Sequence, residues 1–440
     1  MSALRGYPMH KIRFHSIAVM ALTCALCALP AWADSQVRIV RLSDVQGGVQ
    51  IDKNTGLGFE NAFLNLPITQ GVQLRTRDNG RAEIEFEDGS TLRITSNSSV
   101  EFTTLGLNDA GNRISAVNLV DGRGYVNWLG KGGDRFTLNF AREKIELALP
   151  AHFRVNASRD TAEVASFKNE LEVVAPSGTV KVDKKKMVAF DADDHPLAAK
   201  NFEPDSYDEW DQQAVSYHDQ YAKNNNTPYG YGYSDLSYYG SFNNYPGYGL
   251  LWQPYFAGAG WNPFMDGAWS WYPGQGYLWA SAYPWGWMPY YYGNWVNVPG
   301  SGWGWQPGGW STWHGGLHYV GAAATFHAPT VPAGNVNTII VGKGGPILSQ
   351  SPVARTMLTN GSAGIGIARG SLENLHHLNS QVARGGSVEL HPGPQFAASS
   401  PRFGGYGFEG GGRAEALSGG VAHSSAASGA SHSGGTAGHH

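Results

Sequence analysis

The sequence predicts a mainly β protein: an all-β domain, then a module of aromatic β-hairpins, then a disordered tail. Three observations support this fold class. Residues 36–192 alternate apolar and polar side chains in short runs that turn residues separate. Residues 228–315 repeat a pattern of Trp, Tyr, Gly and Pro. Residues 396–440 are mostly Gly, Ser, Ala and His, which leaves little apolar surface to bury.

The composition excludes several classes of protein. Charged residues make up 15% of the 440 residues, which is too few for a coiled coil. The chain has 2 cysteines, too few for a disulfide scaffold. The formal net charge of −4 gives no electrostatic reason to expect nucleic acid as a partner.

Residues 1–33 have the pattern of a secretory signal peptide. Basic residues precede an uncharged apolar run over 17–29, and Ala31-Trp32-Ala33 fits the small-x-small cleavage site. An uncleaved membrane anchor is the alternative, but this run is shorter than the ~20 residues of a spanning helix. We therefore expect export to the periplasm, the cell surface or the medium. Because Cys24 and Cys27 both lie in the leader, the mature chain should contain no cysteine, and no later segment is apolar enough to span a membrane.

The clearest strands form a hairpin over residues 82–94. Two alternating runs flank Asp88-Gly89, a pair that supplies the positive φ angles of a type I′ turn. Ile84 and Phe86 share one face of the first strand, and Glu83, Glu85 and Glu87 share the other. We interpret the three glutamates as solvated charge on a polar face. With about a dozen such strands, residues 36–192 predict a sandwich or a short β-solenoid.

This region resembles the FecR domain family. The resemblance rests on the runs LPITQGVQLRT at 66–76, GRAEIEF at 80–86 and DGSTLRI at 88–94, with weaker matches at 120–126 and 171–173. It implies a β domain that binds something in the periplasm or outside the cell. The best-known members relay a signal from an outer-membrane receptor to a sigma factor through a cytoplasmic segment and a membrane helix. Here we expect a cleavable leader instead, so the resemblance does not imply that regulatory role.

A linker helix is expected over residues 203–223. Apolar or aromatic side chains recur at helical spacing, which predicts an amphipathic stripe that packs on the β domain. The members of the stripe are Tyr207, Trp210, Ala214, Tyr217 and Tyr221. Asp205 or Ser206 can cap its N-terminus.

The aromatic zone contains three copies of one unit. Residues 260–279 recur 26 residues later as 286–305, and a weaker copy lies upstream over 240–252. Each copy has a short strand, a Pro-Gly-x-Gly turn and a second short strand, which predicts a β-hairpin. The zone resembles an uncharacterised Tyr/Trp/Pro-rich repeat domain that often follows FecR-like domains in exported bacterial proteins.

The tryptophans of these repeats have two interpretations. They form the core of a module that is short of aliphatic residues, which we favour, or they form a surface on which sugars or aromatic ligands stack. The candidate stacking residues are Trp261, Trp269, Trp271, Trp287, Trp295, Trp303 and Trp305.

The remaining residues and the chain as a whole show few patterns that are typical of a catalytic or binding site. Residues 316–395 are expected to be loosely ordered, with a short helix near 372–378. None of the common hydrolase, zinc-protease or nucleotide-binding motifs occurs, so we predict a protein without enzymatic activity, cofactor or built metal site. Weak metal capture by the histidines of the tail is an alternative.

The functional prediction is a non-enzymatic exported envelope protein that acts as a scaffold or as a ligand- or partner-binding module. The partner would be an envelope protein or a glycan. Two alternatives remain open at this point. One is cell-wall or polysaccharide binding by the aromatic repeats, and the other is envelope signal sensing together with a membrane partner.

Overall fold

The computed structural model describes residues 37–334, 338–341 and 357–390, which all lie in one compact unit. The predicted leader, 1–33, and the predicted tail, 396–440, lie outside the described residues. The structure is mostly β, as predicted. In the described part of the chain, no helix has the length and apolarity to cross a membrane.

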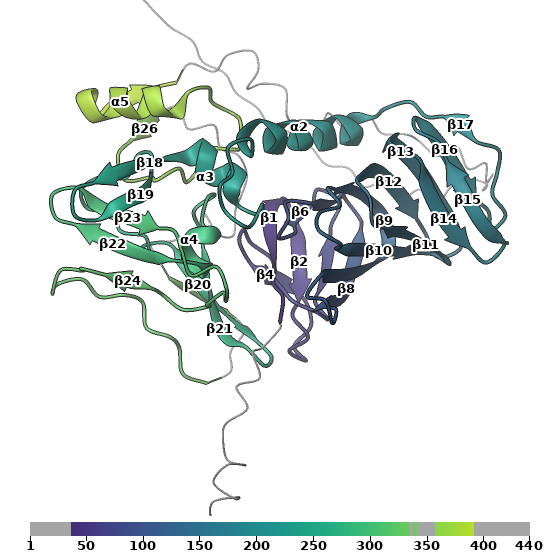
Figure 1. Cartoon of the computed structure of the whole chain (residues 1–440), viewed down its shortest axis with the longest axis horizontal. Coiled ribbons are helices and arrows are strands. Elements are labelled where there is room, and N and C mark those ends of the chain that lie inside the picture. Colours follow the sequence, from purple (N-terminus) through teal and green to yellow (C-terminus); the bar gives the residue numbers. More distant parts are fainter. Residues whose placement is uncertain (1–36, 335–337, 342–356, 391–440) are drawn as a thin grey trace, which may run out of the picture. The chain divides into compact units, whose positions relative to one another are not determined.

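The N-terminal domain consists of two sheets (Figure 1). Sheet A has the order β4-β1-β6-β7-β9-β12-β13-β16-β17. Its strands are β1 (Val40–Gln46), β4 (Pro67–Ile68), β6 (Arg81–Glu85), β7 (Thr91–Ile94), β9 (Arg113–Trp128), β12 (Ala151–Ala157), β13 (Ala162–Lys168), β16 (Lys186–Phe190) and β17 (Lys200–Asn201).

Sheet B has the order β3-β2-β5-β8-β9-β10-β11-β14-β15. Its further strands are β2 (Val49–Asp52), β3 (Glu60–Asn61), β5 (Gln73–Thr76), β8 (Ser99–Leu107), β10 (Arg135–Phe140), β11 (Glu143–Leu147), β14 (Leu171–Ala175) and β15 (Gly178–Val182).

Strand β9 belongs to both sheets. Its first half pairs with β8 and, in parallel, with β10, whereas its second half pairs with β7 and β12. The inner faces of the two sheets share one core, in which Ile84 and Val126 of sheet A cluster with Leu138 and Val173 of sheet B. Of the two predicted architectures the domain is the sandwich, with hairpins that alternate between the sheets.

The predicted hairpin is formed by β6 and β7, with Ala82 opposite Ile94 and Ile84 opposite Leu92. Its turn is closed by a hydrogen bond from the Phe86 amide to the Ser90 carbonyl, 2.8 Å long. Gly89 has a φ of 91°, but Asp88 has no positive φ, so the predicted type I′ turn is wrong. The Gly89 amide donates to the Phe86 carbonyl at 2.8 Å, which gives a three-residue loop with the glycine in the left-handed conformation.

Helix α2 (Ser206–Tyr221) lies within the segment where a helix is expected. Asp205 caps it in a capping box with Asp208. The helix lies across the outer face of sheet A (Figure 1). Its buried side includes Asp208, Asp211 and His218 as well as apolar residues, so polar groups face the sheet.

The three aromatic copies form three hairpins: β18 (Gly240–Tyr245) with β19 (Gly249–Pro254), β20 (Gly267–Tyr272) with β21 (Gly276–Ser281), and β22 (Asn294–Val298) with β23 (Gly302–Gln306). Both glycines of each Pro-Gly-x-Gly turn have positive φ angles, 74° and 76° in the second copy. The first and third hairpins join β24 (Tyr319–Val320) in one sheet, and the second joins β25 (Thr338–Val341) in another. Helices α3 (Tyr233–Tyr239) and α4 (Met288–Tyr291) connect these elements.

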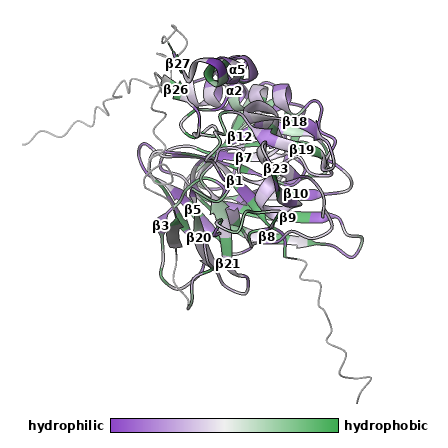
Figure 2. Cartoon of the chain, turned by 90° about the vertical axis from the view of Figure 1, so that its left-hand side faces the viewer, coloured by the Kyte–Doolittle hydropathy of each residue, from purple (hydrophilic) through white to green (hydrophobic). Residues whose placement is uncertain are grey.

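Residues 357–390 are packed, contrary to the expectation of loose order for this region. They form β26 (Met357–Thr359), α5 (Leu375–Gly385) and β27 (Ser387–Glu389). Helix α5 is hydrophilic along much of its length (Figure 2), yet Leu375 and Val382 are buried against the aromatic cluster. A few scattered apolar side chains suffice here because the aromatic module offers a large surface for them to cover.

Candidate functional site

The outward face of β6 carries a buried cluster of charge. Glu83 and Glu85 are each only 1% exposed and Glu87 is 6% exposed, so the prediction of solvated glutamates is wrong. Strand alternation correctly places them on the face opposite Ile84. That face is covered by α2, α3 and the segment around residue 369, and the carboxylates pair with cations there.

We use the name junction network for the eight charged or titratable side chains at this interface. They come from β1, β6, β7, α2, α3 and the C-terminal segment. The members are Arg41, Glu83, Glu85, Arg93, Asp211, His218, Asp235 and Arg369.

Arg41 of β1 joins the sandwich to the aromatic module. Its guanidinium donates through Nη1 to Asp235 Oδ2 of α3, at 2.6 Å, and to Glu85 Oε2, at 3.2 Å. Nη2 donates to the carbonyl of Pro284, which follows β21, at 2.8 Å, and Nε donates to Asn65. Because this side chain is fully buried, these partners must offset the free energy lost when its positive charge is removed from water.

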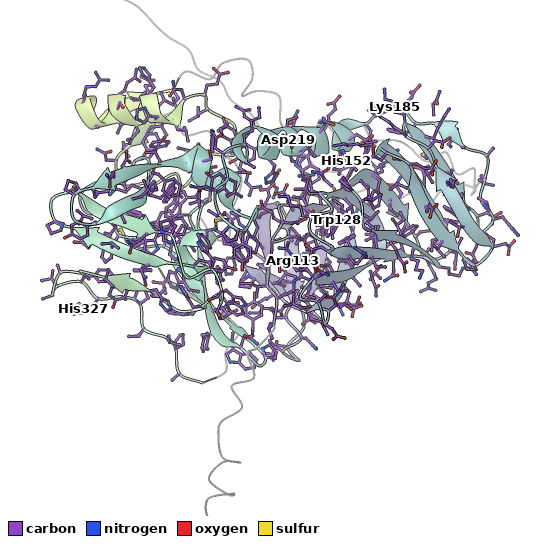
Figure 3. The ribbon with its side chains drawn as sticks, viewed as in Figure 1. Arg113, Trp128, His152, Lys185, Asp219 and His327 are labelled. Carbon is purple, nitrogen blue, oxygen red and sulfur yellow. The ribbon has the colours of Figure 1, made fainter. Side chains whose placement is uncertain are left out.

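Arg93 of β7 links the sandwich to α2. Its Nε donates to Glu83 at 2.7 Å, and its Nη1 donates to Asp211 of the helix at 2.8 Å. The second oxygen of Asp211 lies 2.6 Å from Nε2 of His152, on the strand beneath the helix (Figure 3). His218 Nε2 lies 3.1 Å from a Glu83 oxygen, so the helix contributes both a carboxylate and an imidazole to the network.

Arg369 enters the network from the C-terminal segment. It donates to Glu83 Oε1 at 2.7 Å and to Asp235 Oδ2 at 2.8 Å. Its side chain is 17% exposed, whereas the Glu83 and Asp235 side chains are 1% and 0% exposed. Arg369 therefore bridges a carboxylate of the sandwich and a carboxylate of the aromatic module at the edge of the junction.

The charges of the network nearly balance. Three guanidinium groups face four carboxylates, and the imidazole of His218 lies within 3.1 Å of Glu83. Burial raises the pKa of Glu83, but His218, Arg93 and Arg369 outweigh burial and hold this pKa well below its ordinary value. The pKa of Asp235 is lowered in the same way: burial opposes ionisation, and Arg369 and Arg41 outweigh it. Burial raises the pKa of Glu85.

We predict that Glu83→Gln makes stability less sensitive to acid. A carboxylate whose pKa is lowered by folding stabilises the protein above its ordinary pKa of 4.5, and that stabilisation is lost as pH falls through the lowered value. The variant should therefore be less stable than the parent at pH 7, and the difference should shrink below about pH 4.5. Urea denaturation at a series of pH values measures this.

The matched control is Glu172→Gln on β14, whose side chain is 63% exposed. It should leave the pH dependence of stability as in the parent chain. Equal pH dependence in the parent and in Glu83→Gln would contradict the prediction.

The seven candidate stacking tryptophans do not form an open aromatic surface. Trp271 is half-buried, and the other six are at most 6% exposed. These six are Trp261, Trp269, Trp287, Trp295, Trp303 and Trp305. They cluster with further buried aromatic rings in the second core of the protein. The burial argues against ligand stacking on these six rings and for the core interpretation.

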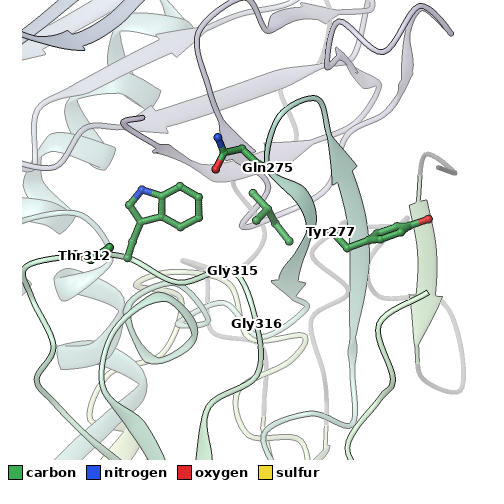
Figure 4. Close-up of a pocket in the computed structure, with 7 residues that line it drawn as sticks. Gln275, Tyr277, Thr312, Gly315 and Gly316 are labelled. Carbon is green, nitrogen blue, oxygen red and sulfur yellow. The ribbon is translucent and has the colours of Figure 1, made fainter. Parts of the chain in front are cut away.

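A pocket of about 340 Å³ lies beside the second hairpin (Figure 4). It is lined by Gln275 of the Pro-Gly-x-Gly turn, by Tyr277 and Leu278 of β21, and by four residues of the segment that follows the third hairpin: Thr312, Trp313, Gly315 and Gly316. Of the predicted stacking residues, none lines it. The pocket has no signature in the sequence, because residues 312–316 meet the hairpin only after the module has folded.

Comparison with known proteins identifies two regions of the chain. Residues 72–172 match the model of the FecR protein family, and residues 233–331 match a family of unknown function, DUF6600. A search of curated proteins found no match.

Two crystal structures of a candidate anti-sigma factor from Parabacteroides distasonis are similar to part of the structure. Both are 16% identical with a TM-score of 0.28. The matches cover 34% and 33% of this chain and 72% and 71% of those chains. From the family matches, the chain carries a FecR domain followed by a DUF6600 domain.

Proposed function

We propose that this chain is a non-enzymatic protein of the cell envelope, exported to the periplasm or the cell surface, where it acts as a rigid scaffold for an envelope partner. The observation that carries the proposal is the junction network. It commits the outer face of sheet A at β1, β6 and β7 to holding α2, α3 and the segment of Arg369, and its carboxylates are buried away from any substrate. The match to FecR supports a role in the envelope.

The outer face of sheet B is the surface that we propose for the partner. The proposed surface is the part formed by β10, β11 and β14, where the outward side chains are partly or fully exposed. At its centre, the amide of Asn139 on β10 donates to Asn118 on β9 at 2.9 Å. Val174 on β14 adds an apolar side chain that is 37% exposed. A sheet face of mixed polarity suits a folded protein partner.

Photo-crosslinking in intact cells tests this proposal. A photoreactive residue at Thr137, on the outer face of sheet B, should capture one envelope protein, and Asn139→Arg should abolish the adduct. The same residue at Glu209, on the exposed side of α2, serves as the matched control and should not capture it. Failure of Thr137 to form a protein adduct, or equal capture from both positions, would overturn the proposed surface.

The other two candidate functions have less support. Polysaccharide binding by the predicted stacking rings conflicts with the burial of six of them. Envelope signalling predicts a membrane protein that co-purifies with the chain from solubilised envelopes. If the partner captured from Thr137 is an integral membrane receptor, the scaffold would be part of a signalling complex.

A further inference from the structure

We propose that the pocket beside the second hairpin binds a neutral sugar ring. This site goes beyond the scaffold function and does not depend on it, because the pocket belongs to the DUF6600 domain and the proposed partner surface belongs to sheet B. Its volume of about 340 Å³ lies at the small end of the range for ligand pockets. The pocket is partly open to solvent. A site that binds one sugar unit of a larger glycan needs such an opening for the rest of the glycan.

An aromatic ring in a fixed orientation lines the pocket. The indole Nε1 of Trp313 donates to the carbonyl of Val37 at 3.0 Å, and the ring packs edge-on against Tyr291 at a centroid distance of 6.2 Å. The side chain is half-buried. The faces of aromatic rings carry partial negative charge, which attracts the weakly positive C–H groups of a sugar. Because the ring is already held in place, binding would cost little side-chain entropy.

Two polar groups of the pocket are available for a ligand. The side-chain amide of Gln275 and the hydroxyl of Thr312 have no hydrogen-bond partner among the described residues. An amide both donates and accepts, and so does a hydroxyl, which matches the paired donor and acceptor character of sugar hydroxyl groups. Figure 4 shows Gln275 and Thr312 on different elements, the hairpin turn and the segment that leads to Gly315.

Two glycines in the wall of the pocket allow other groups to approach the backbone closely. A Cβ added at Gly315 would lie 2.2 Å from Leu278 Cδ2, so a larger residue would displace the apolar floor. The Gly315 carbonyl accepts a hydrogen bond from the Trp279 amide at 2.9 Å, which fixes this segment on the hairpin. At Gly316 a Cβ would meet only Nε2 of His318, at 4.0 Å, so the glycine keeps the backbone of this wall uncovered on that side.

The electrostatics favour a neutral ligand. Among the residues that the structure describes, none that lines the pocket is charged. His314, which lies between Trp313 and Gly315 in the chain, has its pKa lowered to about 4 by burial and by the neighbouring His318. It is therefore neutral at physiological pH and supplies no cation for a phosphate or carboxylate. Neutral hexoses and N-acetylhexosamines fit this lining better than uronic acids or phosphorylated sugars.

Isothermal titration calorimetry of the mature chain tests the inference, with neutral monosaccharides, their oligomers and a uronic acid as probes. We expect at least one neutral sugar to bind and the uronic acid to bind more weakly. Gln275→Ala and Thr312→Val should each weaken binding about threefold to tenfold, as expected for the loss of one hydrogen bond. Trp313→Ala should weaken it more than either.

The matched control is Ser301→Ala, which changes the same turn position in the third hairpin, away from the pocket. It should bind like the parent chain. Gln275→Ala keeps the test valid if Trp313→Ala fails to fold. Absence of binding by every neutral sugar, or unchanged affinity in Gln275→Ala and Thr312→Val, would overturn the sugar site and leave the scaffold proposal untouched.

Discussion

Arg41→Ala is expected to destabilise the folded chain by about 3–5 kcal/mol, the cost of breaking a buried ion pair on one side. The substitution removes the cation that Asp235 and Glu85 share and leaves the Pro284 carbonyl without this donor. Asp235 keeps Arg369 as a partner, but Glu85 loses its nearest guanidinium. Urea denaturation followed by circular dichroism measures the change in the free energy of unfolding.

A matched ion pair on the surface provides the control. Lys181 pairs with Glu170 at 2.8 Å, and the two side chains are 62% and 48% exposed. Lys181→Ala should leave the free energy of unfolding close to that of the parent chain, because water screens the pair and solvates the partner that remains. If Arg41→Ala were as mild as this control, the junction network would not hold the two domains together.

Trp285→Ala is expected to destabilise the protein by about 3–5 kcal/mol through the cavity that it leaves. The indole is fully buried, stacks on Tyr283 with centroids 4.9 Å apart, and contacts the Trp252 ring at 4.8 Å. Its Nε1 also donates to the carbonyl of Ala363 at 2.6 Å. Removing it should therefore loosen the C-terminal segment as well, which hydrogen exchange of residues 357–390 would detect.

Trp271→Ala is the control within the same module. This ring is half-buried, so its loss should cost about 1 kcal/mol and leave hydrogen exchange of the C-terminal segment unchanged. Equal costs for the two substitutions would show that the aromatic rings are interchangeable and would contradict the view of a specifically packed aromatic core.

Local sequence patterns predicted most of the secondary structure. The β6–β7 hairpin follows from alternation around Asp88-Gly89, and the three aromatic hairpins follow from the recurring Pro-Gly-x-Gly turn, because both signals act over a few residues. Helix α2 follows from its aromatic stripe and the Asp205 cap. The FecR-like region was recognised from motifs of which those at 80–86, 88–94 and 120–126 lie within the matched range 72–172, whereas the run at 66–76 overlaps its start.

The environment of the glutamates could not be predicted in this way. Alternation places Glu83 opposite Ile84 on the strand, but it does not say whether the second face meets water or another element. One signal was present: α2 carries Asp208 and Asp211 on the same side as part of its aromatic stripe, and an acidic helix face suits strands that bear arginines. Arg369, 286 residues beyond Glu83, has no local signature at all.

The sequence by itself determined the strands, the turns and the repeated hairpins, because side-chain periodicity and glycine conformation are properties of neighbouring residues. Only the tertiary structure decided which polar faces are buried, which tryptophans form the core and where a pocket remains. Those outcomes depend on segments that meet across hundreds of residues. Burying a charged side chain costs free energy of hydration, and in the junction network side chains of opposite charge from other elements offset that cost.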